Sequence, residues 1–466
     1  MVSLFALALA VRLLYLASME LPAFDPWRHL ALVRNIREGA GFTLFDGQPY
    51  LWYSPIWYYA CAALPQWFRM EWLASLLSAL AAPLTYKLLR RETAEEGRVA
   101  PVVAGLLMAA SGPLVAYTCH YGPEAPALFL TLLALVLSAG TRRAAWALIA
   151  GLAFGTALVL RLNFVFNLFL FIPWLRRKSR VSAWLAGAAI PLLLTWWRNR
   201  SIIREYPWVF TWDGLATRSA DFNPLSALVV QLHPAVQEGL RRLHEQVVPW
   251  PEWILDPGGV AWGLLVFVLC GTGAVIVCRR WHVVLAGGSG LFYFLVLDGS
   301  LSSNFFRIYL VLFPSFFVAL ALLAERLWRA RLVRGRWLAA ALVAVALLSG
   351  AGRLRPPRIL PLEAVTPPEE LLTEDAYLVN SGVYHPESLI YRFPQKSFIG
   401  LPLTPDRLEA FLEQFPRYRT VLWHELSVQD GLKELFENDD RYRRLDSAWN
   451  GHGHSYRTFG MPGGGS

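Results

Sequence analysis

The sequence predicts a polytopic α-helical membrane protein that carries a C-terminal α/β domain outside the membrane. Two features predict this class. The 466 residues are 55% hydrophobic and 17% charged, whereas a soluble chain has about a quarter of charged residues. Apolar segments that approach the ~20 residues of a membrane span also recur throughout residues 1–351. Together these features exclude a purely soluble enzyme and a disordered, nucleic-acid-binding protein.

The apolar segments are expected to form eleven spanning helices. They lie near residues 2–18, 71–90, 99–118, 124–140, 146–162, 163–175, 181–197, 258–278, 282–298, 305–325 and 337–351. The first segment starts at Met1 without a charged leader or a small-residue cleavage site, so we expect an uncleaved anchor.

The charges predict how these helices are oriented. Residues 352–466 hold 13 basic and 16 acidic residues, which leaves 30 basic and 18 acidic residues in 1–351. With the N-terminus inside, every predicted inside loop carries Lys or Arg, as the positive-inside rule requires. The loops 19–70, 119–123 and 198–257 and the C-terminal tail then lie outside. The net charge of +9 is therefore a topology signal, and no nucleic-acid partner is expected.

The charge split also predicts the domains. Residues 1–351 form a transmembrane domain with outer loops 19–70 and 198–257, residues 352–460 form a soluble α/β domain, and residues 461–466 resemble a linker. In the soluble domain the patterns predict strands at 376–380 and 420–423 and helices at 405–415 and 428–436, the first of them capped by Thr404. Surface positions are expected for His424, His452 and His454. In the longer loop, Pro224–Gln246 is expected to lie on the membrane as a helix.

Asp25 opens the most informative segment of the first outer loop. An Asp before a proline, here Pro26, is a helix start, and the stretch that follows is amphipathic up to Gly39. Asp25 and His29 are one turn apart and share a face of this helix. A carboxylate beside an imidazole at a membrane surface can accept a proton from a hydroxyl, although a helix cap without a catalytic role explains the same residues.

Other ionisable candidates also fall at the predicted outer face. Glu124 follows His120 and starts a span, where a carboxylate either complements the helix dipole or acts as a second acid. Arginine suits bidentate phosphate binding, or it extends to lipid headgroups. Candidates of this cationic and polar group lie at the ends of the fifth, seventh and tenth spans: Arg161, Arg198, Asn199, Asn304 and Arg307. Arg12, in the middle of the first span, is expected to pair inside the bundle.

Several short motifs follow one another in a specific order. They are Arg12–Leu16 in the first span, Asp25, the helix Ala31–Gly39, the aromatic Ser54–Tyr59, Glu124, Trp197–Asn199 and the span Arg307–Pro314. In this order and topology the chain resembles the GT-C superfamily of polytopic glycosyltransferases that use polyprenyl-phosphate sugars. It is most similar to the bacterial branch related to protein O-mannosyltransferases and lipid A aminoarabinose transferases. The resemblance covers essentially the whole chain.

The resemblance implies an inverting glycosyltransferase in the bacterial cytoplasmic membrane. It would move a sugar from a polyprenyl-phosphate donor to a protein, lipid or glycan acceptor at the outer face. Asp25 would be the catalytic carboxylate and Glu124 the second acid. Contacts to the donor phosphate or the substrates would come from Arg28, His29, His120, Arg161, Arg198, Asn199, Asn304 and Arg307. The sequence requires no cofactor, although some branches of this family bind a divalent metal at the second acid.

Departures from the family leave the acceptor and the rival functions open. The triplet Asp25–Trp27 is similar to that of oligosaccharyltransferase catalytic subunits, but the tail lacks the Trp-Trp-Asp motif with which those subunits read an acceptor sequon. The alternatives are transfer of a lipid-linked glycan as in oligosaccharyltransferases, a transporter or flippase for lipid-linked sugars, and a non-catalytic scaffold. A transporter predicts inverted repeats and helices broken near mid-membrane, and the sequence pattern indicates neither.

Overall fold

Two compact units, each built from three segments, make up the chain in the computed structural model. The helical unit comprises Met1–Met19, Arg69–Trp196 and Pro224–Pro356, and the mixed unit comprises Glu20–Phe68, Trp197–Asn223 and Pro357–Ser466. The structure describes residues 1–18, 25–45, 47–51, 54–93, 97–119, 121–140, 143–175, 178–210, 216–219, 280–292, 313–330, 333–348, 366–380, 386–401, 405–424, 430–439, 442–451 and 454–460.

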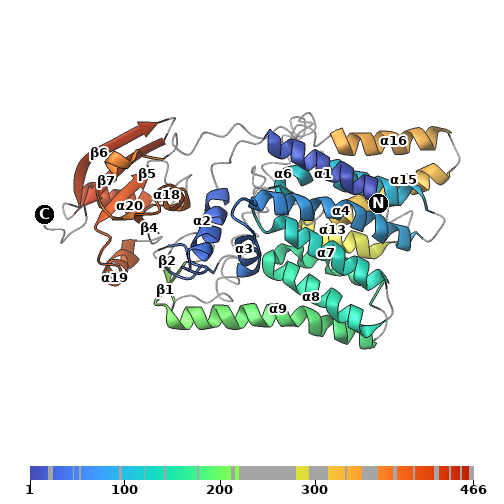
Figure 1. Cartoon of the computed structure of the whole chain (residues 1–466), viewed down its shortest axis with the longest axis horizontal. Helices are drawn as coiled ribbons and strands as arrows, with labels where there is room; N and C mark the ends of the chain where they lie inside the picture. The colour runs from blue at the N-terminus through green and yellow to red at the C-terminus, as the bar shows by residue number, and fades with distance from the viewer. Residues whose placement is uncertain are drawn as a thin grey trace. The chain divides into compact units, whose positions relative to one another are not determined.

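Antiparallel and side-by-side helices build the helical unit. Figure 1 shows α4 lying along α1 and α7, and α7 lying along α8. The elements are α1 (Val2–Ala17), α4 (Met70–Glu92), α5 (Val99–Ala110), α6 (Gly112–Thr118), α7 (Glu124–Gly140), α8 (Ala144–Leu160), the 3-10 helix η1 (Leu162–Phe171), α9 (Lys178–Glu205, which ends in the mixed unit), α13 (Trp281–Phe292), α15 (Phe313–Arg329) and α16 (Val333–Leu348). Helices at the predicted spans 2–18, 71–90, 124–140 and 146–162 are thereby confirmed to within a few residues.

The number of membrane spans stays a prediction. Among the described residues α4 is the one helix that is both long and apolar enough to cross a membrane, with a mean hydropathy of 1.3. Shorter apolar helices are α1, α5, α7, α8 and η1. The 17 residues of α7 extend about 26 Å, against ~30 Å for a bilayer's hydrocarbon core. The predicted span 258–278 and the predicted surface helix Pro224–Gln246 lie outside the described residues.

The third predicted span is not continuous, which corrects the expectation of unbroken helices. Helix α5 ends at Ala110 and α6 starts at Gly112. Pro113 follows in the first turn of α6, and a proline has no N–H to donate to the carbonyl four residues earlier. The carbonyl of Ala109 therefore needs another donor. The predicted span 163–175 also differs, because η1 winds as a 3-10 helix there.

Arg12 supplies the donors at this break. Its side chain is fully buried on α1, where Nη1 donates to the Ala109 carbonyl at 3.0 Å and Nη2 to the Met108 carbonyl at 3.1 Å. Its Nε donates to Ser78 Oγ of α4 at 2.7 Å. The expectation that Arg12 pairs inside the bundle is confirmed, and its partners are the carbonyl oxygens left at a helix end.

Small residues bring α8 and α9 close together. A methyl group at Gly151 of α8 would collide with the Trp184 carbonyl, and one at Gly187 of α9 would collide with the Leu148 carbonyl. Such close backbone contact through small residues is typical of helices that pack in membranes. Elsewhere on α9, large apolar side chains are exposed, with Leu193 and Leu194 at 61% and 60%.

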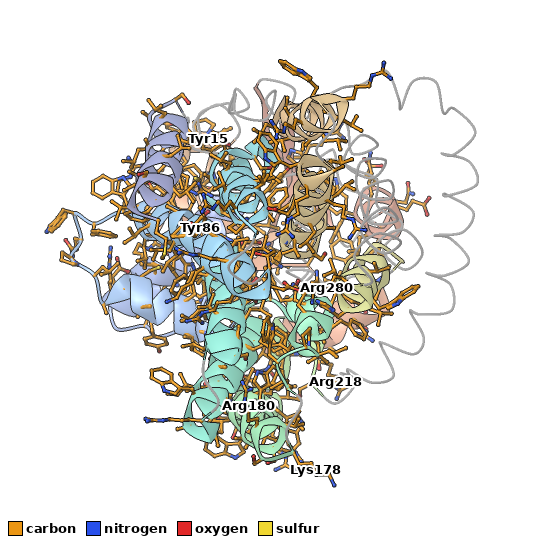
Figure 2. The ribbon with its side chains drawn as sticks, turned by 90° about the vertical axis from the view of Figure 1, so that its right-hand side faces the viewer. Tyr15, Tyr86, Lys178, Arg180, Arg218 and Arg280 are labelled. Carbon is orange, nitrogen blue, oxygen red and sulfur yellow. The ribbon has the colours of Figure 1, made fainter. Side chains whose placement is uncertain are left out.

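Hydrogen bonds from arginines join those helix ends that the charges predict to be inside. Two arginines donate to carbonyls of the last turn of α7: Arg91 Nη1 to Val136 at 2.8 Å and Arg180 Nη2 to Ser138 at 2.6 Å. Arg180 comes from the start of α9 and is labelled in Figure 2. Cations at helix C-termini complement the helix dipole. These basic residues therefore also join α4, α7 and α9 at one end of the helical unit.

The mixed unit combines helices of the first outer loop with the tail sheet. Its elements are α2 (Asp25–Arg37), α3 (Pro55–Ala62), β1 (Trp208–Phe210), β2 (Ala216–Arg218), η4 (Glu369–Leu371), β3 (Ala376–Val379), α18 (Pro386–Arg392), β4 (Ser397–Gly400), η5 (Pro405–Arg407), α19 (Leu408–Gln414), β5 (Thr420–His424), α20 (Asp430–Asn438), β6 (Arg443–Gly451) and β7 (His454–Gly460). The sheet has the order β4-β3-β5-β7-β6, in which β3 is parallel to β4 and β5 and β7 is antiparallel to β5 and β6. The expected strands and helices of the tail are confirmed, and Thr404 lies outside the described residues.

His424 is not a surface residue, contrary to the sequence-based expectation. It ends the central strand β5 and is fully buried. The side chain of Asn380, which follows β3, pairs with the His424 backbone in both directions, donating to its carbonyl at 2.9 Å and accepting from its N–H at 2.6 Å. This pairing continues the contact between β3 and β5 beyond the ladder, and it keeps His424 inside the sheet. His452 and the side chain of His454 lie outside the described residues.

Candidate functional site

Helix α2 presents the predicted catalytic residue at its first position. The helix begins at Asp25, as the Asp-Pro pair predicts, and the structure describes the backbone of Asp25 but not its side chain. At the other end the Gly39 N–H donates to the Ile36 carbonyl at 3.2 Å and the Ala40 N–H to the Asn35 carbonyl at 2.9 Å. Gly39 has a φ of +85°, so this is a Schellman motif that needs glycine. Both ends of α2 are thus set by local sequence.

Arg28 and His29 are buried within the mixed unit, with 2% and 1% of their surface exposed. His29 Nδ1 and the hydroxyl of Tyr58 on α3 form a hydrogen bond of 2.7 Å, and the two rings stack with centroids 5.6 Å apart. Tyr58 is fully buried. A role of Arg28 and His29 as substrate contacts stays a prediction. The burial of His29 favours a role inside the fold.

The tail holds the opposite side of α2 through α18. The ring of Trp27 lies 4.8 Å from that of Tyr391. Arg34 donates to the carbonyls of Ile390 and Tyr391, each at 3.3 Å, and these carbonyls belong to the last turn of α18. Residues more than 350 positions apart in the chain therefore fix the orientation of the helix that starts at Asp25.

Arg198 lies in the same unit and interacts with neutral groups. Its Nη1 donates to Asn199 Oδ1 at 3.0 Å and its Nη2 to the Tyr50 carbonyl at 3.1 Å. The guanidinium also lies over the ring of Phe42, 5.4 Å from its centroid. Burial lowers the pKa of Arg198 from its ordinary value, because a charge is disfavoured where water is excluded. Within the described part of the chain, the two oxygens and the ring that Arg198 contacts carry no charge.

Glu124 is paired with Arg161 in the helical unit. The carboxylate starts α7 and is 3% exposed, and it forms an ion pair with the guanidinium of Arg161 at the end of α8. The carboxylate also packs against Gly122, where a methyl group would collide with Glu124 Oε2. Glu124 is therefore held in place by a charge and by the absence of a side chain two residues before it.

A second buried acid in the helical unit was missed by the sequence reasoning. Glu71, in the first turn of α4, is 2% exposed and forms an ion pair with Arg69. The hydroxyl of Tyr121 bonds to both partners. The signal was available, because Glu71 opens a predicted span in the same way as Glu124 does.

Three predicted site residues, His120, Asn304 and Arg307, lie outside the described residues. Within the described part of the chain, no three side chains of His, Cys, Asp or Glu come together as metal ligands. The structure brings Asp25, Arg28, His29, Arg198 and Asn199 into the mixed unit, and it brings Glu124 and Arg161 into the helical unit.

Comparison with known proteins gives structural relatives only. No family model and no curated protein matches the chain. Among solved structures it is similar to the oligosaccharyltransferase of Archaeoglobus fulgidus in its apo form, with a TM-score of 0.50 and 14% identity over 90% of this chain and 69% of that chain. The chain has a GT-C fold. The C-terminal segment forms an α/β sheet, and membership of the superfamily and of its bacterial branch stays a prediction.

Two further structures of the same archaeal protein match equally well. One is the oligosaccharyltransferase AglB in complex with an inhibitory peptide and a dolichol-phosphate, with a TM-score of 0.50 and 13% identity over 95% of this chain and 72% of that chain. The other is tethered to an acceptor peptide that contains an NVT sequon, with a TM-score of 0.50 and 12% identity over 90% and 68%. At such identities the likeness establishes the fold.

Proposed function

We propose that the chain is an integral membrane, inverting glycosyltransferase. It moves a sugar from a polyprenyl-phosphate donor to an acceptor at the outer face of the bacterial cytoplasmic membrane. Asp25 accepts the proton of the acceptor nucleophile as this attacks the anomeric carbon, and the bond from that carbon to the lipid phosphate breaks. The released phosphate carries the negative charge, which a cation in a water-poor site stabilises.

The observation that carries the proposal is the setting of Arg198. This side chain is half-buried and donates to the oxygens of Tyr50 and Asn199, which are neutral. It belongs to the compact unit in which α2 begins at Asp25. Arginine binds phosphate through a planar fork of donors, and a phosphate would supply the negative charge that the two oxygens lack. A carboxylate and an anion-binding cation are the two groups that this reaction needs.

Glu124 and Arg161 have a different part in this proposal. Arg161 already compensates the buried charge of Glu124, so Arg161 is assigned to holding Glu124 rather than to binding the donor. Glu124 then serves as the second acid that positions the acceptor. Because an ion pair of this kind is costly to break in a buried site, Glu124 stays in place beside Arg161 during the reaction.

A membrane location is supported by the helical unit. Helix α4 meets the length and composition of a span, and exposed side chains of α8, α9 and α16 include Ile149, Leu194 and Trp337. Such surfaces are favourable against lipid chains and costly in water. The break between α5 and α6 is occupied by Arg12, which disfavours the transporter alternative because a transporter uses its broken helices to line a substrate cavity.

Transfer of a lipid-linked glycan to protein is the second candidate. It is favoured by the fold likeness to a protein that was solved with dolichol-phosphate and with an acceptor peptide. Fold likeness alone does not establish function, and the tail lacks the Trp-Trp-Asp motif. A polyprenyl-phosphate monosaccharide is therefore the preferred donor.

The test is transfer by purified protein in detergent or nanodiscs. The protein is incubated with undecaprenyl-phosphate-linked hexoses and pentoses and a membrane extract, and the products are identified by mass spectrometry. Asp25→Asn should lower transfer by about 10²–10⁴-fold while folding survives, because Asn caps a helix about as well as Asp. Asp430→Asn, at the start of α20, is the matched control and should transfer normally. Undiminished transfer by Asp25→Asn would remove Asp25 from the mechanism.

A further inference from the structure

The hydrogen bond between His29 and Tyr58 has no part in the function proposed above, although both side chains are buried in the mixed unit. His29 follows Asp25 by four positions on α2, so the two residues share one face of this helix. Tyr58 lies on α3, which Ser54 caps with its side chain at the Ile56 N–H. The bond thus joins the first turns of α2 to a separate helix.

The contacts continue from Tyr58 toward the proposed anion-binding cation. The ring of Phe42 lies 5.1 Å from that of Tyr58, and the guanidinium of Arg198 lies 5.4 Å above the same Phe42 ring. Phe42 is itself buried. A single row of packed groups, His29–Tyr58–Phe42–Arg198, therefore runs from the helix of Asp25 to Arg198.

We infer that His29 and Tyr58 are positioning residues, which hold the start of α2 at a set distance from Arg198. This inference rests on the proposed function, because only that function requires Asp25 and Arg198 to be a set distance apart. Both side chains are buried and contact each other. A reaction that deprotonates an acceptor while a phosphate departs depends on both groups being in place at once. Misplacement by about 1 Å can cost about 10²-fold in rate.

The hydrogen bond between His29 and Tyr58 can be removed with little change in the shape of either side chain. Tyr58→Phe deletes one hydroxyl and keeps the ring stacked between His29 and Phe42. His29→Phe removes the bond from the other side. His29→Asn places an amide atom near the position of Nδ1 and should restore the bond to Tyr58. Tyr206→Phe deletes a hydroxyl elsewhere in the mixed unit and is the control.

The experiment measures transfer from undecaprenyl-phosphate-linked sugars at several donor concentrations, together with the melting temperature of each variant. Tyr58→Phe and His29→Phe should lower kcat by about tenfold with the donor KM unchanged, and they should also lower the melting temperature, because a buried polar atom loses its partner. His29→Asn should recover most of the rate, and Tyr206→Phe should behave as wild type. An unaffected kcat in Tyr58→Phe, or a kcat that stays low in His29→Asn although its melting temperature recovers, would overturn the inference.

A double variant separates this inference from the proposed function. If the pair acts through Asp25, adding Tyr58→Phe to Asp25→Asn should leave the residual rate of Asp25→Asn unchanged, because residues that act as one unit are not additive. Multiplied losses would show that Tyr58 acts independently and would overturn the positioning role. If Asp25→Asn alone keeps full transfer, the proposed function has failed instead.

Discussion

Arg12 and Arg161 of the helical unit differ from Arg198 of the mixed unit in the groups that they contact. In the helical unit Arg161 is matched by the carboxylate of Glu124, and Arg12 is surrounded by carbonyls at a helix break. In the mixed unit Arg198 donates to two neutral oxygens and lies over a ring. A cation that is already neutralised stabilises the fold, whereas one that is not can attract an anion. The proposed function accounts for this difference by giving Arg12 and Arg161 structural roles and by giving Arg198 a binding role.

Replacing Arg161 should have the largest effect on stability and tests its structural role most strongly. Arg161→Gln should destabilise the helical unit by about 3 kcal/mol, since a carboxylate buried without its partner is costly. Differential scanning calorimetry in detergent measures the change. Adding Glu124→Gln to the variant should restore most of the stability, because two amides replace the pair. No loss of stability in Arg161→Gln would mean that the pair is not structural.

Removing Arg12 also tests the structural role of arginine in the helical unit, with a smaller expected effect. Arg12→Met keeps the length of the side chain but leaves the carbonyls of Met108 and Ala109 without their donor, which should cost about 2 kcal/mol. Thermal unfolding of the purified protein reports the loss. The control is Arg90→Met, since Arg90 is exposed at the end of α4. Equal melting temperatures for the two variants would contradict the account of the helix break.

In the mixed unit, the contact between α2 and α18 offers a finer test. Tyr391→Ala removes the ring that packs on Trp27 and should destabilise the unit by about 1 kcal/mol. Transfer should fall as well, because the contact orients α2. Tyr391→Phe keeps the ring and should preserve both quantities. A normal transfer rate in Tyr391→Ala would show that α2 is oriented without the tail.

Alkaline pH should weaken the tail sheet slightly. Burial raises the pKa of Tyr377 and of Tyr418 above the ordinary value, because the neutral phenol is favoured where water is excluded. The folded state then holds these protons more tightly than the unfolded state. Their contribution to stability is complete below about pH 10 and is lost as the pH rises further. As the pH rises, the free energy of unfolding should fall less steeply in Tyr418→Phe than in wild type. An identical fall would show that Tyr418 does not contribute to the loss of stability.

Local patterns predicted much of the fold. The start of α2 followed from Asp25 and Pro26, and the ends of α7 were located within the span 124–140 because Glu124 and Gly140 bound an apolar run. The break between α5 and α6 was also signalled, since Ser111-Gly112-Pro113 is a turn-forming run. It was overlooked because the apolar composition continues through it.

The site could be predicted only in part. Asp25, Glu124 and the arginines are found by their position relative to apolar runs, which is a local property. The bond from His29 to Tyr58 joins residues 29 positions apart, and the contact of Arg34 with Tyr391 joins residues 357 positions apart. Such contacts depend on how loops return in space, and no local pattern encodes this. His424 was misplaced for the same reason, because its burial follows from the central position of β5 in the sheet.

Binding of a short polyprenyl phosphate, farnesyl phosphate, tests the central claim most directly. Isothermal titration compares wild type with Arg198→Gln and with the double variant Arg161→Gln/Glu124→Gln. Because a charge-assisted contact to phosphate is lost, Arg198→Gln should bind at least about tenfold more weakly with an unchanged melting temperature. The double variant should keep its affinity. Wild-type affinity in Arg198→Gln, or weakened binding in the double variant alone, would contradict the division of roles between the two units.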